Sequence, residues 1–287
     1  MEWIGYNIKE KRKKVKREME MEEGERARMG KLGSYGGEIR LLLEDAEEES
    51  AAEEIMLLWG IQQPTLSKPN TFVSQTSLKL SLDSCGHSLS ILQSPSSLAT
   101  PGVTGSVMWD SGVVLGKFLE HSVDSRMLLL QGKKIVELGS GCGLVGCIAA
   151  LLGGEVILTD LPDRLRLLRK NIETNMRHGS LRGSVTAMEL AWGEDPDPEI
   201  VKPVPDYVLG SDVVYSEGAV IDLLETLGHL SGPNTTIFLA GELRNDAILE
   251  YFIEAAMRNF TIGRVDQTLW HPDYRSNRVV LYVLVKK

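Results

Sequence analysis

A glycine-rich segment has the clearest chemical content of any part of this sequence. It reads Glu137-Leu138-Gly139-Ser140-Gly141-Cys142-Gly143, so glycine recurs at alternate positions. Such glycines let the backbone turn tightly and approach a ligand closely, and a helix beginning behind them offers free N–H groups to an anionic group. Asp160 follows at the end of the next apolar run, where its carboxylate can accept both ribose hydroxyls of a nucleoside. The segment and the acid together predict a nucleoside-binding unit.

The same glycines fit two kinds of cofactor. Gly141, Gly143 and Gly146 satisfy the G-x-G-x-x-G pattern of dinucleotide-binding enzymes, so a dehydrogenase that transfers hydride is one hypothesis. Three features favour S-adenosyl-L-methionine instead: Glu137 two residues before the first glycine, the additional alternate glycine Gly139, and an expected antiparallel finish to the sheet. We therefore predict a methyltransferase, with the dehydrogenase as its rival.

The elements that must position these residues follow from the hydrophobic pattern. From residue 133 onward, short apolar runs alternate with segments whose apolar residues share one helical face. This alternation is typical of a doubly wound α/β domain, which binds ligands at the carboxyl ends of its parallel strands. Only a loop separates the last two strands, which predicts that they are antiparallel. The expected strands are 135–138, 156–159, 185–190, 207–213, 236–240, 261–265 and 279–285, and the expected helices are 144–152, 163–177, 217–230 and 246–259.

Upstream of these elements the sequence predicts a hairpin and a charged tail. Two alternating runs over 77–92 flank the turn at Asp83-Ser84-Cys85-Gly86, which is a β-hairpin signature, and Asp110 is expected to cap a helix that reaches Glu120. Residues 9–17 carry seven basic side chains, and residues 44–54 are nearly all acid and alanine. Such charge blocks predict mobile, solvated chain. The expected division is a charged, disordered tail and linker over 1–71 and one folded methyltransferase domain over 72–287.

Composition narrows the class of protein further. With 43% hydrophobic residues the chain can bury a sizeable core, and its net charge of −9 argues against nucleic acid as the main partner. No uncharged apolar stretch approaches the roughly 20 residues that span a bilayer, so no membrane role is expected. The five histidines and three cysteines lack metal-ligand spacing, so no metal site is expected. An odd, small number of cysteines suits a reducing compartment, which predicts a cytoplasmic location, with the nucleus as a second one.

Several motifs in a fixed order resemble a known family. The motifs and their order along the chain are similar to those of the methyltransferase-like 21 family of class I, seven-β-strand protein lysine methyltransferases, over about residues 78–287. Within the family, Thr159-Asp160-Leu161 and Asp273-Tyr274-Arg275-Ser276 most resemble the member that modifies an AAA-type chaperone. The motifs are Val107-Met108-Trp109-Asp110-Ser111-Gly112, residues 136–146, Leu158-Thr159-Asp160-Leu161, Leu190-Ala191-Trp192-Gly193 and Gly210-Ser211-Asp212-Val213-Val214-Tyr215.

The resemblance implies that S-adenosylmethionine is the cofactor and gives roles to individual residues. Trp109 and Trp192 would flank the cofactor, and Asp160 would bind its ribose. Each has a structural alternative: the tryptophans as core aromatics, and Asp160 as the cap of a helix that starts near Pro162. The other cofactor-binding residues implied are Gly139, Ser140 and Gly141 at the methionine end, Ser211 in the adjoining strand-end wall, and Glu137.

Asp212 and Tyr215 form an Asp-x-x-Tyr motif after the fourth strand, at the expected mouth of the site. A lysine ammonium, with a pKa of about 10.4, has no electron pair for methyl transfer, so the enzyme must favour the neutral amine and hold it in line. We predict that both residues are catalytic, with Asp212 as an acceptor that orients the amine. The alternative is that Asp212 only caps a helix beginning near Glu217. Val213-Val214 stands where enzymes that methylate nucleic-acid bases typically have two prolines, which favours a protein substrate.

The resulting hypothesis is transfer of a methyl group from S-adenosylmethionine to a lysine side chain of another protein, with an AAA-type chaperone as the lead partner. One alternative is a methyltransferase that acts on a small molecule or another residue type, because fold and cofactor do not determine the acceptor. The other is a non-catalytic binding module, against which the intact Gly139, Gly141, Asp160, Asp212 and Tyr215 argue. Two roles stay open for residues 270–274: lining the lysine channel, or packing against the edge of the sheet.

Overall fold

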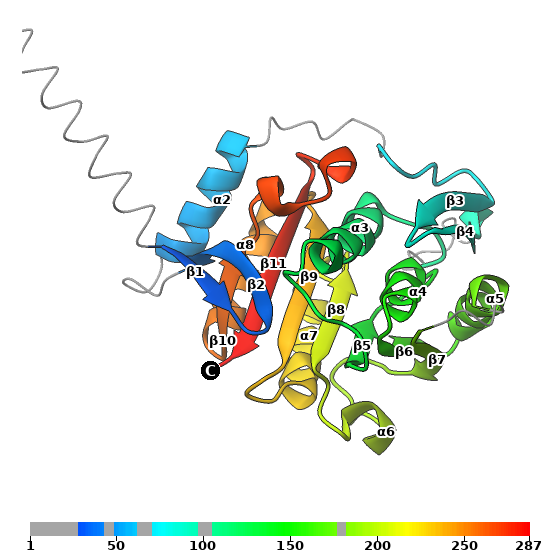
Figure 1. The fold of residues 1–287 in the computed structure, drawn as a ribbon. Coiled ribbons are helices and arrows are strands. Elements are labelled where there is room, and N and C mark those ends of the chain that lie inside the picture. Colours follow the sequence, from blue (N-terminus) through cyan, green and yellow to red (C-terminus); the bar gives the residue numbers. More distant parts are fainter. Residues whose placement is uncertain (1–27, 43–48, 62–70, 97–104, 177–181) are drawn as a thin grey trace, which may run out of the picture.

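The computed structural model describes residues 28–42, 49–61, 71–96, 105–176 and 182–287. Its strands form one nine-stranded sheet and a separate hairpin of β3 (Lys79–Ser84) and β4 (His87–Leu92) (Figure 1). In spatial order the sheet contains β1 (Met29–Leu32), β2 (Tyr35–Leu42), β10 (Phe260–Arg264), β11 (Val279–Lys286), β9 (Thr236–Glu242), β8 (Tyr207–Ser211), β5 (Lys134–Leu138), β6 (Glu155–Asp160) and β7 (Ser184–Glu189).

The centre of the sheet is parallel and its last strands are antiparallel. Strands β7, β6, β5, β8 and β9 all run in one direction, and β11 lies between β9 and β10, antiparallel to both. This confirms the predicted doubly wound sheet with an antiparallel last strand. Leu138, Asp160, Ser211 and Glu242 are the last residues of four strands, so they reach the same edge of the sheet, where such folds bind ligands.

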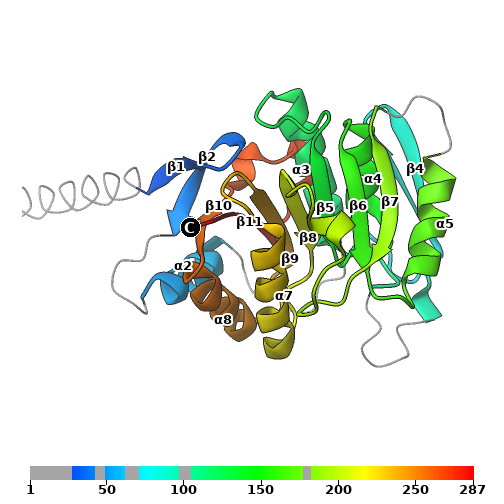
Figure 2. The ribbon, with the colours of Figure 1, turned by 90° about the horizontal axis from the view of Figure 1, so that it is seen from below.

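Helices cover both faces of the sheet (Figure 2). Each face of the sheet has its own apolar core beneath the helices that cover it. None of the helices in the described ranges is long and apolar enough to cross a membrane. One group consists of α3 (Asp110–Asp124), α4 (Leu144–Leu151) and α5 (Leu165–Asn175), and the other of α2 (Glu49–Ile61), α7 (Glu217–Leu230) and α8 (Asp246–Met257), with the short α6 (Pro198–Val201).

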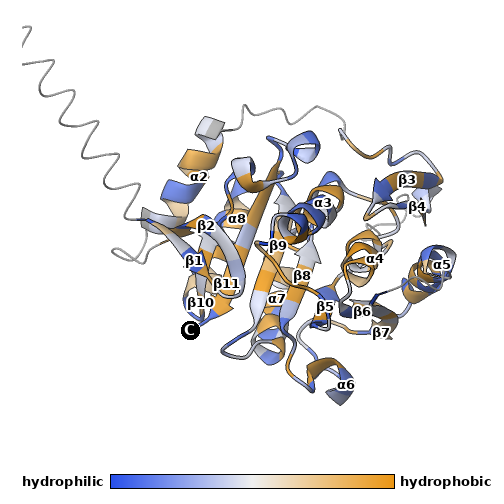
Figure 3. Ribbon diagram, in the orientation of Figure 1, coloured by the Kyte–Doolittle hydropathy of each residue, from blue (hydrophilic) through white to orange (hydrophobic). Residues whose placement is uncertain are grey.

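The periodicity of the sequence explains these layers. Ile135 and Val136 are neighbours on β5, yet their side chains belong to the cores on opposite faces, because successive side chains of a strand alternate. The central strands and α4 are strongly apolar, whereas α5 has a polar outer side (Figure 3). All eight residues of α4 are buried, but only Leu165, Leu168 and Asn171 of α5 are. The spacing of apolar residues predicts both the buried helix α4 and the half-exposed helix α5.

The N-terminal region differs from the expected tail. Residues 1–27 lie outside the described part, but β1 and β2 extend the sheet beyond β10, to which β2 is antiparallel. Tyr35 and Ile39 of β2 are completely buried, and α2 packs on α8 with Ile55 and Leu58 in the core. Folded structure therefore begins well before residue 72. The apolar residues that build it are few and stand between blocks of charge, which is why the sequence pattern favoured a tail.

The predicted hairpin of β3 and β4 is present and is fastened to α5. Asn175 Oδ1 accepts the Ser90 N–H at 2.6 Å, and Asn171 bonds both the N–H and the carbonyl of Leu92, at 2.8 and 3.0 Å. The Asn171 amide also donates to the Cys142 carbonyl at 2.9 Å. One buried amide thus connects the hairpin with the glycine-rich segment.

Candidate active site

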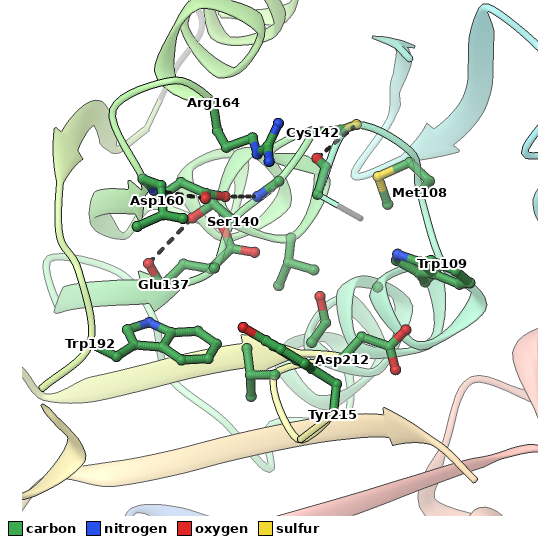
Figure 4. Close-up of a pocket in the computed structure, with 18 of the residues that line it drawn as sticks. Met108, Trp109, Glu137, Ser140, Cys142, Asp160, Arg164, Trp192, Asp212 and Tyr215 are labelled. Atoms are coloured by element: carbon green, nitrogen blue, oxygen red, sulfur yellow. Dashed lines mark hydrogen bonds between the residues drawn. The ribbon is translucent and has the colours of Figure 1, made fainter. Parts of the chain in front are cut away.

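A cavity of about 280 Å³ opens at the carboxyl ends of β5, β6 and β8 (Figure 4). We call it the main cavity. Its size is near the lower end of the ~300–1,000 Å³ typical of small-molecule sites. The cavity is lined by all ten residues that the sequence analysis placed in a site: Trp109, Glu137, Gly139, Ser140, Gly141, Asp160, Trp192, Ser211, Asp212 and Tyr215.

The glycine-rich segment forms one wall of the main cavity, and its backbone conformation requires glycine at several positions. Gly139 and Gly141 have φ of 58° and 53°, in the left-handed region. A Cβ atom on Gly141 would lie 2.9 Å from the Gly105 carbonyl oxygen, and one on Gly139 would lie 3.1 Å from the Trp192 ring. Gly143, with φ of 81°, is the N-cap of α4 and offers no side-chain acceptor to the first turn. The backbone of the segment can therefore approach a ligand closely.

Glu137 is a buried carboxyl at the base of this wall, with 1% of its surface exposed. Its Oε2 atom accepts the Gly146 N–H at 2.9 Å, which ties β5 to the first turn of α4. Burial raises the pKa of Glu137 to about 8, and the nearby Asp160 charge adds to this, although the bonds from Gly146 and Ser140 oppose it. Glu137 is therefore largely protonated at neutral pH.

Asp160 faces the main cavity from the end of β6. One carboxylate oxygen accepts the Gly141 N–H at 2.7 Å, and the other accepts the Leu161 N–H at 2.8 Å. Burial raises the pKa of Asp160, whereas the two N–H donors and Arg164 oppose the rise. Helix α5 begins at Leu165 with its N-cap at Arg164, so Asp160 does not cap it. A carboxylate accepts about four hydrogen bonds, which leaves acceptor capacity for hydroxyl groups of a ligand.

Aromatic side chains form the other walls. Trp109 and Trp192 lie on opposite sides of the main cavity, and both are only half-buried, so neither is an ordinary core aromatic (Figure 4). The Tyr215 ring centroid is 6.0 Å from that of Trp192, and 55% of Tyr215 is exposed. Burial raises the Tyr215 pKa, and the charges of Asp160 and Asp222 raise it further, so its hydroxyl is neutral at ordinary pH. These rings shield the cavity on the side where Tyr215 meets solvent.

Asp212 follows β8 in a conformation that is unusual for an aspartate. Its φ is 59°, which costs of order 1–3 kcal/mol for a residue other than glycine and is commonest at functional sites. Its Oδ1 atom accepts the Glu242 N–H at 2.9 Å, and its Oδ2 atom lies 2.6 Å from Arg244 Nη2. Burial raises the Asp212 pKa, and Arg244 opposes this. The N-cap of α7 is Ser216, whose hydroxyl accepts the Ala219 N–H, so Asp212 is not the cap.

Two charged residues beside Asp212 had no role in the sequence analysis. Glu242 ends β9 and is 2% exposed as a side chain, and Arg244 follows it with its Cζ atom 3.9 Å from the centroid of the Trp109 ring. Their proximity to Asp212 arises because β9 lies next to β8 in the sheet. The available signal was their position at the carboxyl end of a strand; their contacts depend on the order of the strands.

The structure corrects the interpretation of Asp110. Its carboxylate does not cap α3 but accepts the N–H groups of Thr71, Phe72 and Val73, at 2.6, 3.0 and 3.2 Å. Residues 270–274 pack rather than line the main cavity: Trp270 is buried, and the Tyr274 ring lies 5.3 Å from that of Phe72. Asp110 therefore fastens a segment that precedes the hairpin.

The residues of the main cavity fit S-adenosylmethionine in kind. The glycine backbone is open where a Cβ atom would collide with Gly105, Asp160 offers spare acceptor capacity, and indole faces attract cationic groups such as a sulfonium. A metal does not fit equally well, because the described residues contain no group of three His, Cys, Asp or Glu side chains that could hold one. The glycine backbone, the Asp160 carboxylate and the indole rings therefore suit an organic, cationic nucleoside.

Comparison with known proteins gives consistent matches. The profile of the family described as lysine methyltransferase matches residues 89–258. EEF1A lysine methyltransferase 3 of Mus musculus is 41% identical over 169 residues, which is 58% of this chain and 67% of the relative. Protein N-lysine methyltransferase METTL21A of Mus musculus is 39% identical over 161 residues, 56% of this chain and 70% of the relative. A solved glycopeptide N-methyltransferase complexed with S-adenosyl-L-methionine covers 60% of this chain and 94% of its own, with a TM-score of 0.47 and 14% identity.

The fold and the site together define a class I methyltransferase that uses S-adenosylmethionine. The chain belongs to the lysine methyltransferase family, as the profile match over more than half of its length shows. It is an enzyme that methylates lysine side chains of proteins, and the resemblance to the methyltransferase-like 21 family is confirmed. The dehydrogenase, the non-catalytic module and the methyltransferase for other acceptors are set aside.

Proposed function

We propose that methyl transfer takes place in the main cavity beside Asp212 and Tyr215, with the target lysine entering past the exposed face of Tyr215. The observation that supports this most strongly is the placement of Asp212. A buried aspartate in a strained backbone conformation lines the same cavity as the glycine-rich segment and Asp160. Strain of this kind persists where the surrounding structure holds a side chain in position.

The cofactor-binding roles follow from the groups that each wall offers. When bound, S-adenosylmethionine supplies an electrophilic methyl group on a positively charged sulfur. Asp160 would accept the ribose hydroxyls, and the backbone of Gly139, Ser140 and Gly141 would lie against the methionine end of the cofactor. Trp109 and Trp192 would enclose the cofactor from two sides, while Glu137 and Ser211 complete the wall at the strand ends.

The acceptor side requires an oriented, neutral amine. The Asp212 carboxylate is nearly inaccessible to water but keeps acceptor capacity beyond its bonds to Glu242 and Arg244, so it can accept an N–H of the lysine amine. Tyr215 and Trp192 exclude water from the same side. Asp212 therefore acts as an orienting acceptor. It speeds the reaction by holding the amine nitrogen in line with the methyl group to be transferred.

For the substrate, two protein classes are the first to test. The name of one relative points to translation elongation factor 1A, and the resemblance of short motifs points to an AAA-type chaperone such as valosin-containing protein. We also propose a cytoplasmic location, with the nucleus as a second one. The free thiols of Cys85, Cys142 and Cys147 support a reducing compartment.

A labelling experiment tests this function. The purified chain is incubated with S-adenosylmethionine carrying a radioactive methyl group and, in parallel, with elongation factor 1A, an AAA-type chaperone or a cell extract. We expect one discrete labelled protein, with methyl-lysine found by mass spectrometry, and no label with Asp212→Ala. Label on small molecules alone, or on a residue other than lysine, would contradict the proposal.

A further inference from the structure

Arg244 connects three groups at the acceptor side of the main cavity. Its Nη2 atom lies 2.6 Å from Asp212 Oδ2 and 3.2 Å from Glu242 Oε2, and its guanidinium stacks over the Trp109 ring. The side chain is 40% exposed, whereas those of Asp212 and Glu242 are 10% and 2% exposed. Arg244 is thus a cation held against a buried carboxylate and an aromatic wall of the site.

Arg244 also stands at the junction of two cavities. A second cavity, of about 160 Å³, is lined by Arg244, Glu242 and apolar residues that include Phe252, and it shares Val213 and Tyr215 with the main cavity. The Asp212–Arg244 pair therefore lies between the two cavities, because Asp212 lines the main cavity and Arg244 lines the second one. The guanidinium already occupies the Asp212 Oδ2 atom, which would otherwise attract a lysine ammonium.

The charges around this pair come from several elements. Glu242 on β9 faces Arg244, and Asp110 on α3 and Arg278 before β11 face Glu242 in turn. Tyr215 contributes a neutral hydroxyl, with Asp160 and Asp222 facing it from the far side. Glu242 makes three direct contacts. Its Oε1 atom accepts the Asp110 N–H at 3.0 Å, and its Oε2 atom lies 3.2 Å from Arg244 and 3.4 Å from Arg278. Arg244 and Arg278 thus face the carboxylates of Asp212 and Glu242, and the third carboxylate, that of Asp110, is bound by three backbone N–H groups.

We propose that Arg244 keeps the acceptor lysine uncharged, because as the resident cation of Asp212 it makes the site favour an amine over an ammonium. The proposal rests on the proposed role of Asp212 as the acceptor of the lysine N–H. Arg244 is a positioning residue in this scheme, since it acts on the amine through Asp212 and through its charge.

The physical reason is the balance of charge. Beside Asp212 alone, an ammonium would be stabilised by an unpaired carboxylate, and its pKa would rise above the usual value of about 10.4. With Arg244 in place the carboxylate is already neutralised, and a second cation is repelled. Loss of the proton to water would leave the nitrogen with the electron pair that forms the new N–C bond, while the S–C bond of the bound cofactor would break with its electrons left on sulfur, giving S-adenosylhomocysteine. A carboxylate without its arginine would bind lysine in the unreactive form.

The test compares the pH dependence of the chemical step. The acceptor protein recovered by labelling is mixed with excess enzyme and S-adenosylmethionine, and single-turnover methyl transfer is followed from pH 6.5 to 10 for the wild type, Arg244→Gln, Arg244→Met and Arg244→Lys. Arg258→Gln is the matched control, because it removes the same charge from an exposed position at the opposite end of α8. Binding of S-adenosylhomocysteine by calorimetry, and thermal unfolding, show whether each variant is folded.

We expect both neutral variants to shift the midpoint of the rate profile upward by about one pH unit, so that they transfer about tenfold more slowly than wild type at pH 7.5 and the difference narrows as the pH approaches 10. Arg244→Lys keeps the charge and the midpoint, although its rate falls because lysine lacks the stacked, planar fork. Arg258→Gln matches the wild type. Affinity for the acceptor protein at pH 7.5 stays the same or becomes tighter in the neutral variants, since the protonated lysine then binds an unpaired carboxylate.

Other outcomes overturn the inference in distinguishable ways. An equal loss at every pH in Arg244→Gln and Arg244→Met would show that Arg244 only supports the fold of the site, and an unchanged profile would show that its charge is irrelevant. Asp212→Asn separates this inference from the proposed function. If that variant transfers methyl groups at the wild-type rate, the role of Asp212 itself is refuted.

Discussion

Two buried carboxyl groups in the main cavity have different hydrogen-bond environments, and these suit them to different tasks. Asp160 receives two backbone N–H bonds and faces Arg164, all of which favour its charged form. Glu137 receives one N–H bond and is almost completely desolvated, which favours its neutral form. The first is suited to accept hydroxyl groups of a ligand, and the second to hold the loop that presents the cavity wall.

Replacing Asp160 by alanine should weaken binding of S-adenosylhomocysteine by about 1–3 kcal/mol, the cost of leaving buried hydroxyl groups without a partner. Titration calorimetry measures this directly. Asp124→Ala is the control, because that side chain is exposed at the end of α3 and does not line the main cavity. Equal affinity of the Asp160 variant and the wild type would refute the ribose-binding role.

Glu137 should make the stability of the protein depend on pH. Its pKa is about 8 in the folded chain, against an ordinary value of 4.5, so the folded state binds more protons between these values. The unfolding free energy therefore falls as pH rises from 5 to 8, by at most about 1.4 kcal/mol per pH unit from this group. Glu137→Gln, which stays neutral and keeps an acceptor for the Gly146 N–H, should flatten the dependence in denaturant titrations. A variant with the wild-type slope would contradict this assignment.

Among the helices and strands, the turn between β5 and α4 is constrained by its backbone. Gly141→Ala should reduce both stability and cofactor affinity, since its Cβ would meet the Gly105 carbonyl oxygen at 2.9 Å and its φ is 53°. Gly228→Ala is a matched control within α7, where an added Cβ meets nothing within 4 Å. That change should stabilise the protein by up to about 1 kcal/mol, as alanine favours the helix. Similar melting temperatures for the two variants would show that the loop tolerates a side chain.

Which elements were predictable from sequence depends on how local their determinants are. The strand and helix pattern of residues 133–287 follows from local periodicity, and Asp160, Ser211 and Asp212 follow because they stand at the carboxyl ends of strands, whereas Trp109 and Trp192 follow from the motifs of the family. The contacts of Arg244 and Asp110 could not be predicted from the sequence. The order of the strands brings Asp212 to Arg244, and the segment that begins at Thr71 reaches Asp110 on α3. The alternation of β2 is equally local, but its burial depends on pairing with β10, more than two hundred residues away.

For the molecule as a whole, residues 28–42 and 49–61 are part of the folded unit. Glu54 of α2 pairs with Arg264 of β10 at 2.7 Å and accepts the Tyr282 hydroxyl of β11 at 3.2 Å, all of them buried. The Gly263 and Ile262 positions of β10 pair with β2. Residues 28–42 and 49–61 thus cover one edge and part of one face of the sheet, and Glu54 is a buried charge that needs its partner.

A chain shortened to begin at residue 71 should therefore be markedly less stable than the full chain. It loses the buried side chains of β2 and α2 and leaves Arg264 without its carboxylate partner, a defect that alone costs about 3–5 kcal/mol. Removal of residues 1–27 takes away none of the contacts described above and is the control. Thermal unfolding of the three chains is the measurement, and equal transition temperatures would show that the N-terminal strands and α2 add nothing to the fold.

The most direct test of the site as a methyl-transfer centre separates cofactor binding from turnover at Asp212. Asp212→Asn and the wild type are compared for S-adenosylhomocysteine affinity by calorimetry and for methyl-lysine on the acceptor protein by mass spectrometry. Because the proposed function places Asp212 beside the acceptor and gives it no contact with the cofactor, the variant should bind S-adenosylhomocysteine within about twofold of the wild type, while methyl-lysine falls by roughly a hundredfold or more. Unchanged methylation, or an equal loss of binding and methylation, would contradict the placement of the acceptor lysine beside Asp212.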